Sequence, residues 1–282
     1  MISALDSSDQ RISRDNTGKA NLEKVMLFSS EKTKGPFSKR SIDIICLAIF
    51  LVSIAVRLVK LVFEPLLLRD GALYLRLAEV WYQTGVPKGN TSIPFLPLLC
   101  IKTLMGFCGD SEIAGRSITL FLGGLIPVIG FILARMITHN IRFSLIAALC
   151  FILHPNLVSY SIQPLRENYY ILLIGLLMIT MVWNFRNTRT AGWIACGAII
   201  GIAFFCRLES LEFLVIVAVE IAILELKKKK ILSFLKSTCV FLLAFALTLI
   251  SMLAWINGDS SFVMRVENYR NKIMMEWSRP AR

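Results

Sequence analysis

Six ionisable residues from separate parts of the chain lie next to the ends of long apolar runs. These residues are Asp70, His154, Arg166, Glu167, Arg207 and Glu209. Ionisable groups at the edge of the membrane are candidates for function, because membrane segments otherwise exclude them. A carboxylate there could take a proton from a hydroxyl group, and an arginine could bind a phosphate.

Each candidate also has a simpler interpretation. Asp70 precedes a segment of helical spacing, Gly71 to Trp81, and aspartate is a common N-cap, so the chain by itself favours a cap. The two arginine–glutamate pairs could be interfacial charges that close helix ends. The histidine precedes Pro155 and is interpreted as structural.

The composition predicts an integral membrane protein. Hydrophobic residues make up 56% of the 282 residues and charged residues only 18%, with a mean hydropathy of +0.66. The formal charge of +12 is read as a signal of membrane topology. No basic tract is interleaved with aromatic residues, which argues against a nucleic-acid partner.

The apolar runs predict an all-α fold with about seven transmembrane helices in one module, residues 41–256. The expected spans cover about 42–63, 113–137, 143–162, 167–183, 191–206, 211–226 and 231–256. Pro155 should interrupt the third span, because proline removes a backbone hydrogen bond. The fifth and sixth spans share one long run, which Arg207 to Ser210 divides.

Two segments flank the module and one long loop interrupts it. Residues 1–40 are predicted to form a disordered cytoplasmic tail, and residues 257–282 an outer tail. The first outer loop, 64–112, should contain two interfacial helices. The first would lie on the membrane through its apolar side, formed by Leu73, Leu77, Val80 and Trp81. The second, about 94–107, carries two prolines and a lysine.

The distribution of lysine and arginine predicts the orientation. The N-terminal tail and the cluster Lys227 to Lys230 should face the cytoplasm, and every loop predicted inside is net positive. All six candidate residues then belong to the outer face. Arg57, near the outer end of the first span, is expected to snorkel to the headgroups. A multi-pass protein of the bacterial inner membrane is the favoured location, with the active site outside.

Several segments, in this order, resemble membrane glycosyltransferases of the GT-C superfamily, in the branch of protein O-mannosyltransferases and lipid A aminoarabinose transferases. The resemblance covers roughly residues 42–256. The matching segments are RDGALYLRLAEVWYQTG, with Asp70 and Tyr74 in D-x3-Y spacing, then IPFLPLL, EIAGRSITLFLGGLIPVIGFILAR, HPNLVSYSIQPLRENYY and GIAFFCRLESLEFL.

The resemblance implies a transferase that moves a sugar from a polyprenyl-phosphate carrier to a protein or glycolipid acceptor at the outer face. The acidic position of the first outer loop maps onto Asp70, and a second acidic position maps onto Glu167, which would position the acceptor or a metal. A divalent cation is an open option for this site. The remaining expected substrate-binding residues are Tyr74, Arg57, Arg166, Arg207, Glu209 and His154.

Two other functions stay open. Proteins of this kind usually continue past the seventh span into further helices, whereas this sequence stops at Arg282, so we expect a compact version or a fragment. A non-catalytic lipid-binding or complex subunit on the same scaffold is one alternative. A small transporter is another, although the sequence reading finds no charge in the middle of a span.

Overall fold

The computed structural model describes residues 39–85, 94–187, 189–226 and 231–255, and these ranges contain helices and no strand. The chain divides into two compact units, residues 1–45 and residues 46–282. The predicted outer tail and nearly all of the predicted cytoplasmic tail lie outside the described residues. The prediction of an all-α fold is confirmed.

Within the described ranges, four helices are long and apolar enough to cross a membrane. The shortest has 22 residues and is therefore about 33 Å long, against a hydrocarbon core of about 30 Å. Each agrees with a predicted span to within a few residues. The four are α2 (Lys39–Phe63), α5 (Ser111–Thr138), α8 (Arg166–Asn187) and α11 (Ile231–Trp255).

A fifth candidate span is broken at Pro155, as the sequence predicted. Helix α6 (Ile141–Leu153) and helix α7 (Pro155–Ser161) are separated by His154 alone, and the two helices are bent by 59°. Proline is tolerated in the first turn of α7, where its missing N–H has no intrahelical partner. Helices α6 and α7 provide a fifth span only if the two bent helices together cross the membrane.

The expectation of seven spans is wrong by these criteria, since the described helices provide four spans, or five with the bent pair. The difference lies in α9 (Thr190–Phe204) and α10 (Glu212–Leu226), which have 15 residues each. Such helices are about 22 Å long and do not cross a core of about 30 Å. The break between them was predicted correctly, at a 3-10 turn, η1 (Leu208–Leu211).

The segment between α2 and α5 contains the two expected helices, α3 (Arg69–Thr84) and α4 (Phe95–Cys108). Of the four residues predicted on the membrane-facing side of α3, only Trp81 is buried in the protein. Leu73 is 43% exposed, whereas the buried residues are Gly71, Tyr74, Leu75, Ala78 and Trp81. An amphipathic pattern does not distinguish a stripe that faces protein from one that faces lipid.

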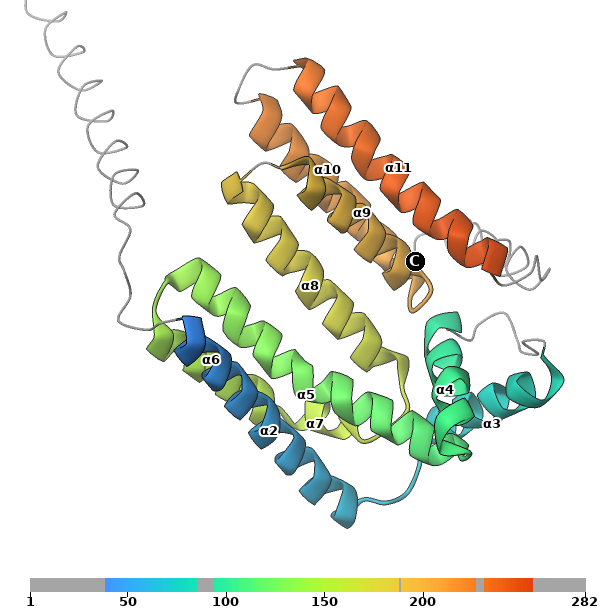
Figure 1. Cartoon of the computed structure of the whole chain (residues 1–282). Coiled ribbons are helices and arrows are strands. Elements are labelled where there is room, and N and C mark those ends of the chain that lie inside the picture. Colours follow the sequence, from blue (N-terminus) through green and yellow to red (C-terminus); the bar gives the residue numbers. More distant parts are fainter. Residues whose placement is uncertain (1–38, 86–93, 188, 227–230, 256–282) are drawn as a thin grey trace, which may run out of the picture. The chain divides into compact units, whose positions relative to one another are not determined.

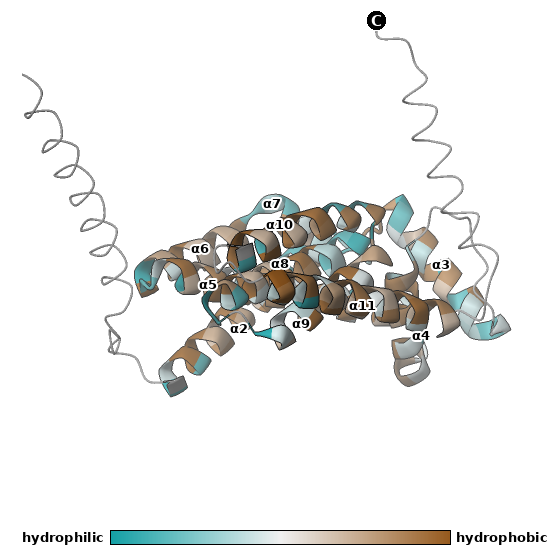
Figure 2. Cartoon of the chain, turned by 90° about the horizontal axis from the view of Figure 1, so that it is seen from above, coloured by the Kyte–Doolittle hydropathy of each residue, from teal (hydrophilic) through white to brown (hydrophobic). Residues whose placement is uncertain are grey.

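Two apolar clusters organise the helices of the second unit. Helix α5 contacts α3, α4, α6, α7 and α8, and the first cluster joins α3 and α4 to the end of α9. The second cluster joins α8, α9, α10 and α11 around Trp193 and Phe241. Figure 1 shows α9 and α11 side by side, and Figure 2 shows apolar residues along most of the helices.

Candidate functional site

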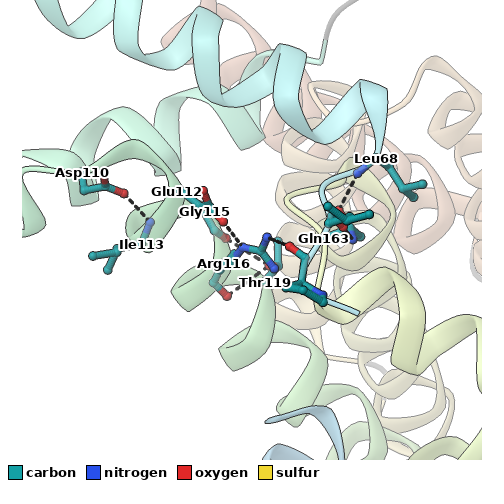
Figure 3. Close-up of polar contacts among 10 residues, drawn as sticks. Leu68, Asp110, Glu112, Ile113, Gly115, Arg116, Thr119 and Gln163 are labelled. Atoms are coloured by element: carbon teal, nitrogen blue, oxygen red, sulfur yellow. Dashed lines mark hydrogen bonds and ion pairs between the residues drawn. The ribbon is translucent and has the colours of Figure 1, made fainter. Parts of the chain in front are cut away.

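The segment between α2 and α3 is held in place by two side chains that lie far from it in the sequence. Gln163, just before α8, accepts a hydrogen bond from the backbone N–H of Leu68 at 3.0 Å and donates one to the carbonyl of Leu66 at 2.8 Å. Arg116 of α5 donates to the carbonyl of Pro65 and to Glu112 Oε1, the latter at 2.7 Å. Figure 3 shows Gln163 and Arg116 converging on this segment. The beginning of α3 is therefore fixed from two sides.

The start of α3 also approaches its neighbours closely. A Cβ at Gly71 would lie 3.1 Å from the ring of Pro164, and a Cβ at Gly115 of α5 would lie 2.5 Å from a methyl group of Leu75. A side chain at either position would therefore require Pro164 or Leu75 to shift. Helix α3 consequently packs against α5 and against the turn that leads into α8.

Asp70 is not an N-cap, which corrects the simpler interpretation from the sequence. Helix α3 begins at Arg69, one residue earlier than Asp70, and its N-cap residue is Leu68, which makes no side-chain capping bond. Asp70 instead lies in the first turn and is exposed. A carboxylate there interacts favourably with the helix dipole, and its side chain remains accessible to a second molecule.

Tyr74 lies one helical turn after Asp70, and its side chain is buried. Burial raises the pKa of the Tyr74 phenol, and the surrounding charges modify it further. These charges belong to α3, α8 and the turn after α9, namely Arg166, Glu167, Asp70 and Arg207. Two predicted catalytic carboxylates and two predicted phosphate-binding arginines therefore act electrostatically on one buried tyrosine.

The two arginine–glutamate pairs are loose. The distance from Arg166 Nε to Glu167 Oε1 is 3.4 Å, and the distance from Arg207 Nη2 to Glu209 Oε1 is also 3.4 Å. Charge-assisted hydrogen bonds are typically about 2.7–2.9 Å long, so neither arginine is saturated by its neighbour. The Arg207 guanidinium also lies 5.3 Å from the ring centre of Tyr170, in a cation–π contact.

The surroundings of Glu209 stabilise the ionised form of its carboxyl group. Burial by itself would raise its pKa, but a hydrogen bond from its own backbone and the charge of Arg207 outweigh that effect. The net result is a pKa of Glu209 below its usual range. The charge of Arg166 acts in the same direction, which again indicates that these side chains lie near one another.

Three buried polar atoms in this region have no hydrogen-bond partner among the described residues. They are Arg207 Nε, Ser210 Oγ and Tyr169 Oη. Buried donors are nearly always paired in proteins, and an unpaired one costs about 1–3 kcal/mol. Ser210 and Arg207 belong to the same turn, since the backbone N–H of Ser210 donates to the carbonyl of Arg207 at 3.2 Å.

Two predicted substrate-binding residues lie apart from this group. Arg57 does not snorkel to the headgroups, because its side chain is fully buried, donates to Ser53, and lies beside Gly123 and Ser161. His154 is exposed at the break between α6 and α7, and no hydrogen bond or ion pair within the described ranges joins it to the charged residues. The structure does not bring either residue to Tyr74.

Sequence reasoning missed several residues that matter here. It gave no role to Arg116, Gln163 or Ser210, whose importance comes from contacts with distant backbone or from burial. It also counted no charge in the middle of a predicted span, although Glu220 lies in the middle of the predicted sixth span, 211–226. Arg57 is buried within α2, and Glu220 lies in the middle of α10 with Oε2 buried and unpaired within the described part of the chain.

A metal site receives no support from the described residues. No three His, Cys, Asp or Glu side chains among them are grouped closely enough to hold a metal ion. The chemistry of the candidate site therefore rests on its carboxylates and its arginines.

The anchoring of the segment before α3 leads to a first prediction. Gln163→Ala removes two hydrogen bonds, each worth about 0.5–1.5 kcal/mol. We expect a lower melting temperature in detergent and faster tryptic cleavage after Arg69. Gln83→Ala, an exposed glutamine near the end of α3, is the matched control and should change neither. Equal cleavage rates in both variants would contradict the anchoring role.

No protein-family model, curated protein or solved structure matches this chain. The resemblance to membrane glycosyltransferases therefore rests on the sequence segments alone.

Proposed function

We propose that this protein is a membrane glycosyltransferase of the GT-C type, which moves a sugar from a polyprenyl-phosphate carrier to a hydroxyl group of a protein or glycolipid acceptor. The observation that supports it most is the grouping of Asp70, Glu167, Arg166 and Arg207 around the buried Tyr74. Such a set pairs a possible proton acceptor with groups that stabilise a leaving phosphate.

The proposed reaction assigns separate roles to these residues. Asp70 takes the proton of the acceptor hydroxyl while its oxygen forms a bond to the anomeric carbon of the sugar. The bond between that carbon and the phosphate oxygen breaks, and its electron pair leaves with the lipid phosphate. Arg166 and Arg207 stabilise the negative charge on this phosphate. Glu167 positions the acceptor and compensates the positive charge of Arg166.

The unpaired donors favour a phosphate site near η1. Arg207 Nε and Ser210 Oγ are both buried donors without partners within the described ranges, and a phosphate has oxygens to accept from both. Arg166 and Arg207 are each about one-third exposed, so a ligand can reach them. Their glutamate partners lie far enough away to be exchanged for a more closely bound anion.

The proposal is tested by carrier binding and transfer in lipid nanodiscs. Arg207→Gln keeps a polar side chain of moderate length but removes the charge. We expect farnesyl phosphate to bind at least about tenfold more weakly, since a hydrogen bond to a charged group contributes roughly 1.5–3 kcal/mol. Arg76→Gln, an exposed arginine of α3, is the control. Unchanged binding in Arg207→Gln would remove this arginine from the phosphate site.

The proposed orientation places Asp70 outside and the N-terminus in the cytoplasm. Helix α5 has 28 residues and spans about 42 Å, so the segments before and after it belong to opposite sides if it crosses the membrane. Lys88 of the predicted outer loop and Lys229 of the predicted cytoplasmic cluster would report on the two sides, but both lie outside the described residues. Exposed positions next to the two ends of α5 therefore make better reporters.

A labelling experiment checks this orientation. Cys108, exposed at the end of α4, should react with a membrane-impermeant maleimide added to intact cells. A cysteine at the exposed Arg142, after α5, should react only once the membrane is opened. Each is measured in a chain whose other cysteines are replaced by serine or alanine. Labelling of both from the same side would contradict a membrane crossing by α5.

A small transporter is the second candidate, and one observation favours it. Glu220 lies within the apolar helix α10, its Oε2 is buried and unpaired among the described residues, and an ionisable residue in an apolar helix of a membrane protein is a candidate for an ion or proton pathway. Glu220→Gln separates the two functions. A glycosyltransferase should keep carrier binding and transfer in this variant, whereas a transporter should lose uptake into proteoliposomes.

A further inference from the structure

An apolar groove lies between α4 and α5, with a volume of about 470 Å³. Five of its lining residues belong to α4 and one to α5. The lining consists of Leu99, Cys100, Thr103, Leu104, Phe107 and Ile118. The hydroxyl of Thr103 already donates to the carbonyl of Leu99 at 2.8 Å. The groove therefore favours an apolar occupant.

One end of the groove approaches the charged residues of the candidate site. The first turn of α4 is joined to the end of α9, because the N–H of Leu96 donates to the carbonyl of Phe205 at 3.2 Å. The rings of Phe95 and Phe205 also pack edge to face, with centroids 6.1 Å apart. Phe205 is two residues before Arg207. Cys100 in turn lies little more than one helical turn after Leu96.

The electrostatics of a buried cysteine agree with this arrangement. Burial raises the pKa of Cys206, and the next contributions come from Cys100, Arg166 and Glu167. Cys206 is therefore near the groove through Cys100 and near the candidate site through Arg166 and Glu167. The two features are neighbours and not separate parts of the surface.

The other end of the groove leads away from the site. From Cys100 to Phe107 the helix rises about 10 Å. Phe107 is 85% exposed, although it is a large apolar side chain. The groove thus extends from the neighbourhood of the arginines to an exposed apolar end of α4.

We propose that this groove binds the hydrocarbon chain of the lipid whose phosphate lies at Arg166 and Arg207. The inference rests on the proposed function and adds the place where the carrier's chain is recognised. The occupant of this groove must be apolar along α4 and must carry an anionic group that reaches Arg166 and Arg207. A phosphorylated lipid with a single chain has both properties. Each methylene group of the chain that is taken from water would strengthen binding about fourfold.

Photo-crosslinking locates the chain directly. The probe is farnesyl phosphate with a diazirine at the end of its chain, bound to the full-length protein in nanodiscs. We expect crosslinks to peptides of α4 that contain Leu104 or Phe107, and their loss when excess unlabelled farnesyl phosphate is added. Competed crosslinks confined to α2, α8 or α11 would overturn the groove and leave the proposed function intact. The absence of any competed crosslink would count against both.

A matched pair of substitutions tests the groove by affinity. Thr103→Trp fills it, whereas Gly106→Trp adds the same side chain to α4 at an exposed position with nothing within 4 Å of a Cβ. We expect Thr103→Trp to weaken the binding of farnesyl phosphate at least about tenfold. This loss corresponds to the exclusion of roughly two methylene groups from the groove. Gly106→Trp should bind as wild type does.

Inorganic phosphate serves as the probe without a chain. Its affinity should be the same in Thr103→Trp and in the wild type, because it does not enter the groove. A loss of phosphate binding in Thr103→Trp would mean that the substitution disturbs the arginines, and Leu104→Phe then replaces it as a smaller filling of the same groove. Equal affinities for farnesyl phosphate in the wild type and both filled variants would overturn the inference.

Discussion

Asp70→Asn is expected to reduce sugar transfer by about a hundred- to ten-thousand-fold while leaving the protein folded. Removal of a general base typically has an effect of this size, since an amide does not accept the proton of the attacking hydroxyl. Asp70 is exposed and forms no side-chain cap, so no capping bond is lost in the variant. The weaker interaction with the dipole of α3 changes stability by only about 0.3–1 kcal/mol. Transfer is measured with a radiolabelled polyprenyl-phosphate sugar.

The same substitution at another aspartate provides the control. Asp110 is the N-cap of α5, and its Oδ1 accepts a hydrogen bond from the N–H of Ile113 at 2.8 Å. Asparagine caps about as well as aspartate, so Asp110→Asn should retain both stability and transfer. Binding of farnesyl phosphate should be near wild type in both variants. An active Asp70→Asn protein would remove Asp70 from the reaction.

Gly197→Ala is expected to prevent α9 and α11 from packing, and therefore to lower the yield and melting temperature of the protein sharply. An added Cβ would lie 2.4 Å from the carbonyl oxygen of Phe241 and 2.9 Å from the backbone nitrogen of Phe245. These are backbone atoms, so no change of rotamer relieves the clash. Overpacking of this kind typically costs about 1–3 kcal/mol, and more where the backbone must move.

A second helical glycine serves as the control for this effect. A Cβ at Gly106 of α4 would have nothing within 4 Å. Gly106→Ala should be neutral or stabilising, because alanine is favoured over glycine in helices by about 1 kcal/mol. Thermal unfolding in detergent compares the two variants with the wild type. Similar melting temperatures for both would show that α9 and α11 can separate without loss of stability.

The close contact of α9 and α11 explains how short helices are accommodated. Small residues allow membrane helices to approach until their backbones touch. A Cβ at Gly201, one turn after Gly197, would lie 2.9 Å from Thr248 of α11. Helix α9 is therefore supported along its length by the longer α11. Its contribution to the fold comes from this packing and not from its own length.

Much of the architecture could be predicted from the order of residues. Long apolar runs predict helices because every backbone group in a membrane must be hydrogen-bonded within its own segment. Four spans and the break before Pro155 follow from this requirement. The ends of α3 and α4 are equally local, since Gly85 and Gly109 adopt the left-handed conformation that glycine tolerates.

The candidate site depended on contacts between distant segments. The sequence by itself identified Asp70, Glu167, Arg166 and Arg207 as chemically suitable, and it favoured a cap for Asp70. Only the packing of α3 against α5 and the turn before α8 brought these groups around Tyr74. In the same packed structure Gln163 positions the beginning of α3, whereas Arg57 is buried away from the site. Hydropathy and spacing describe each helix alone, whereas these outcomes depend on which faces of different helices meet.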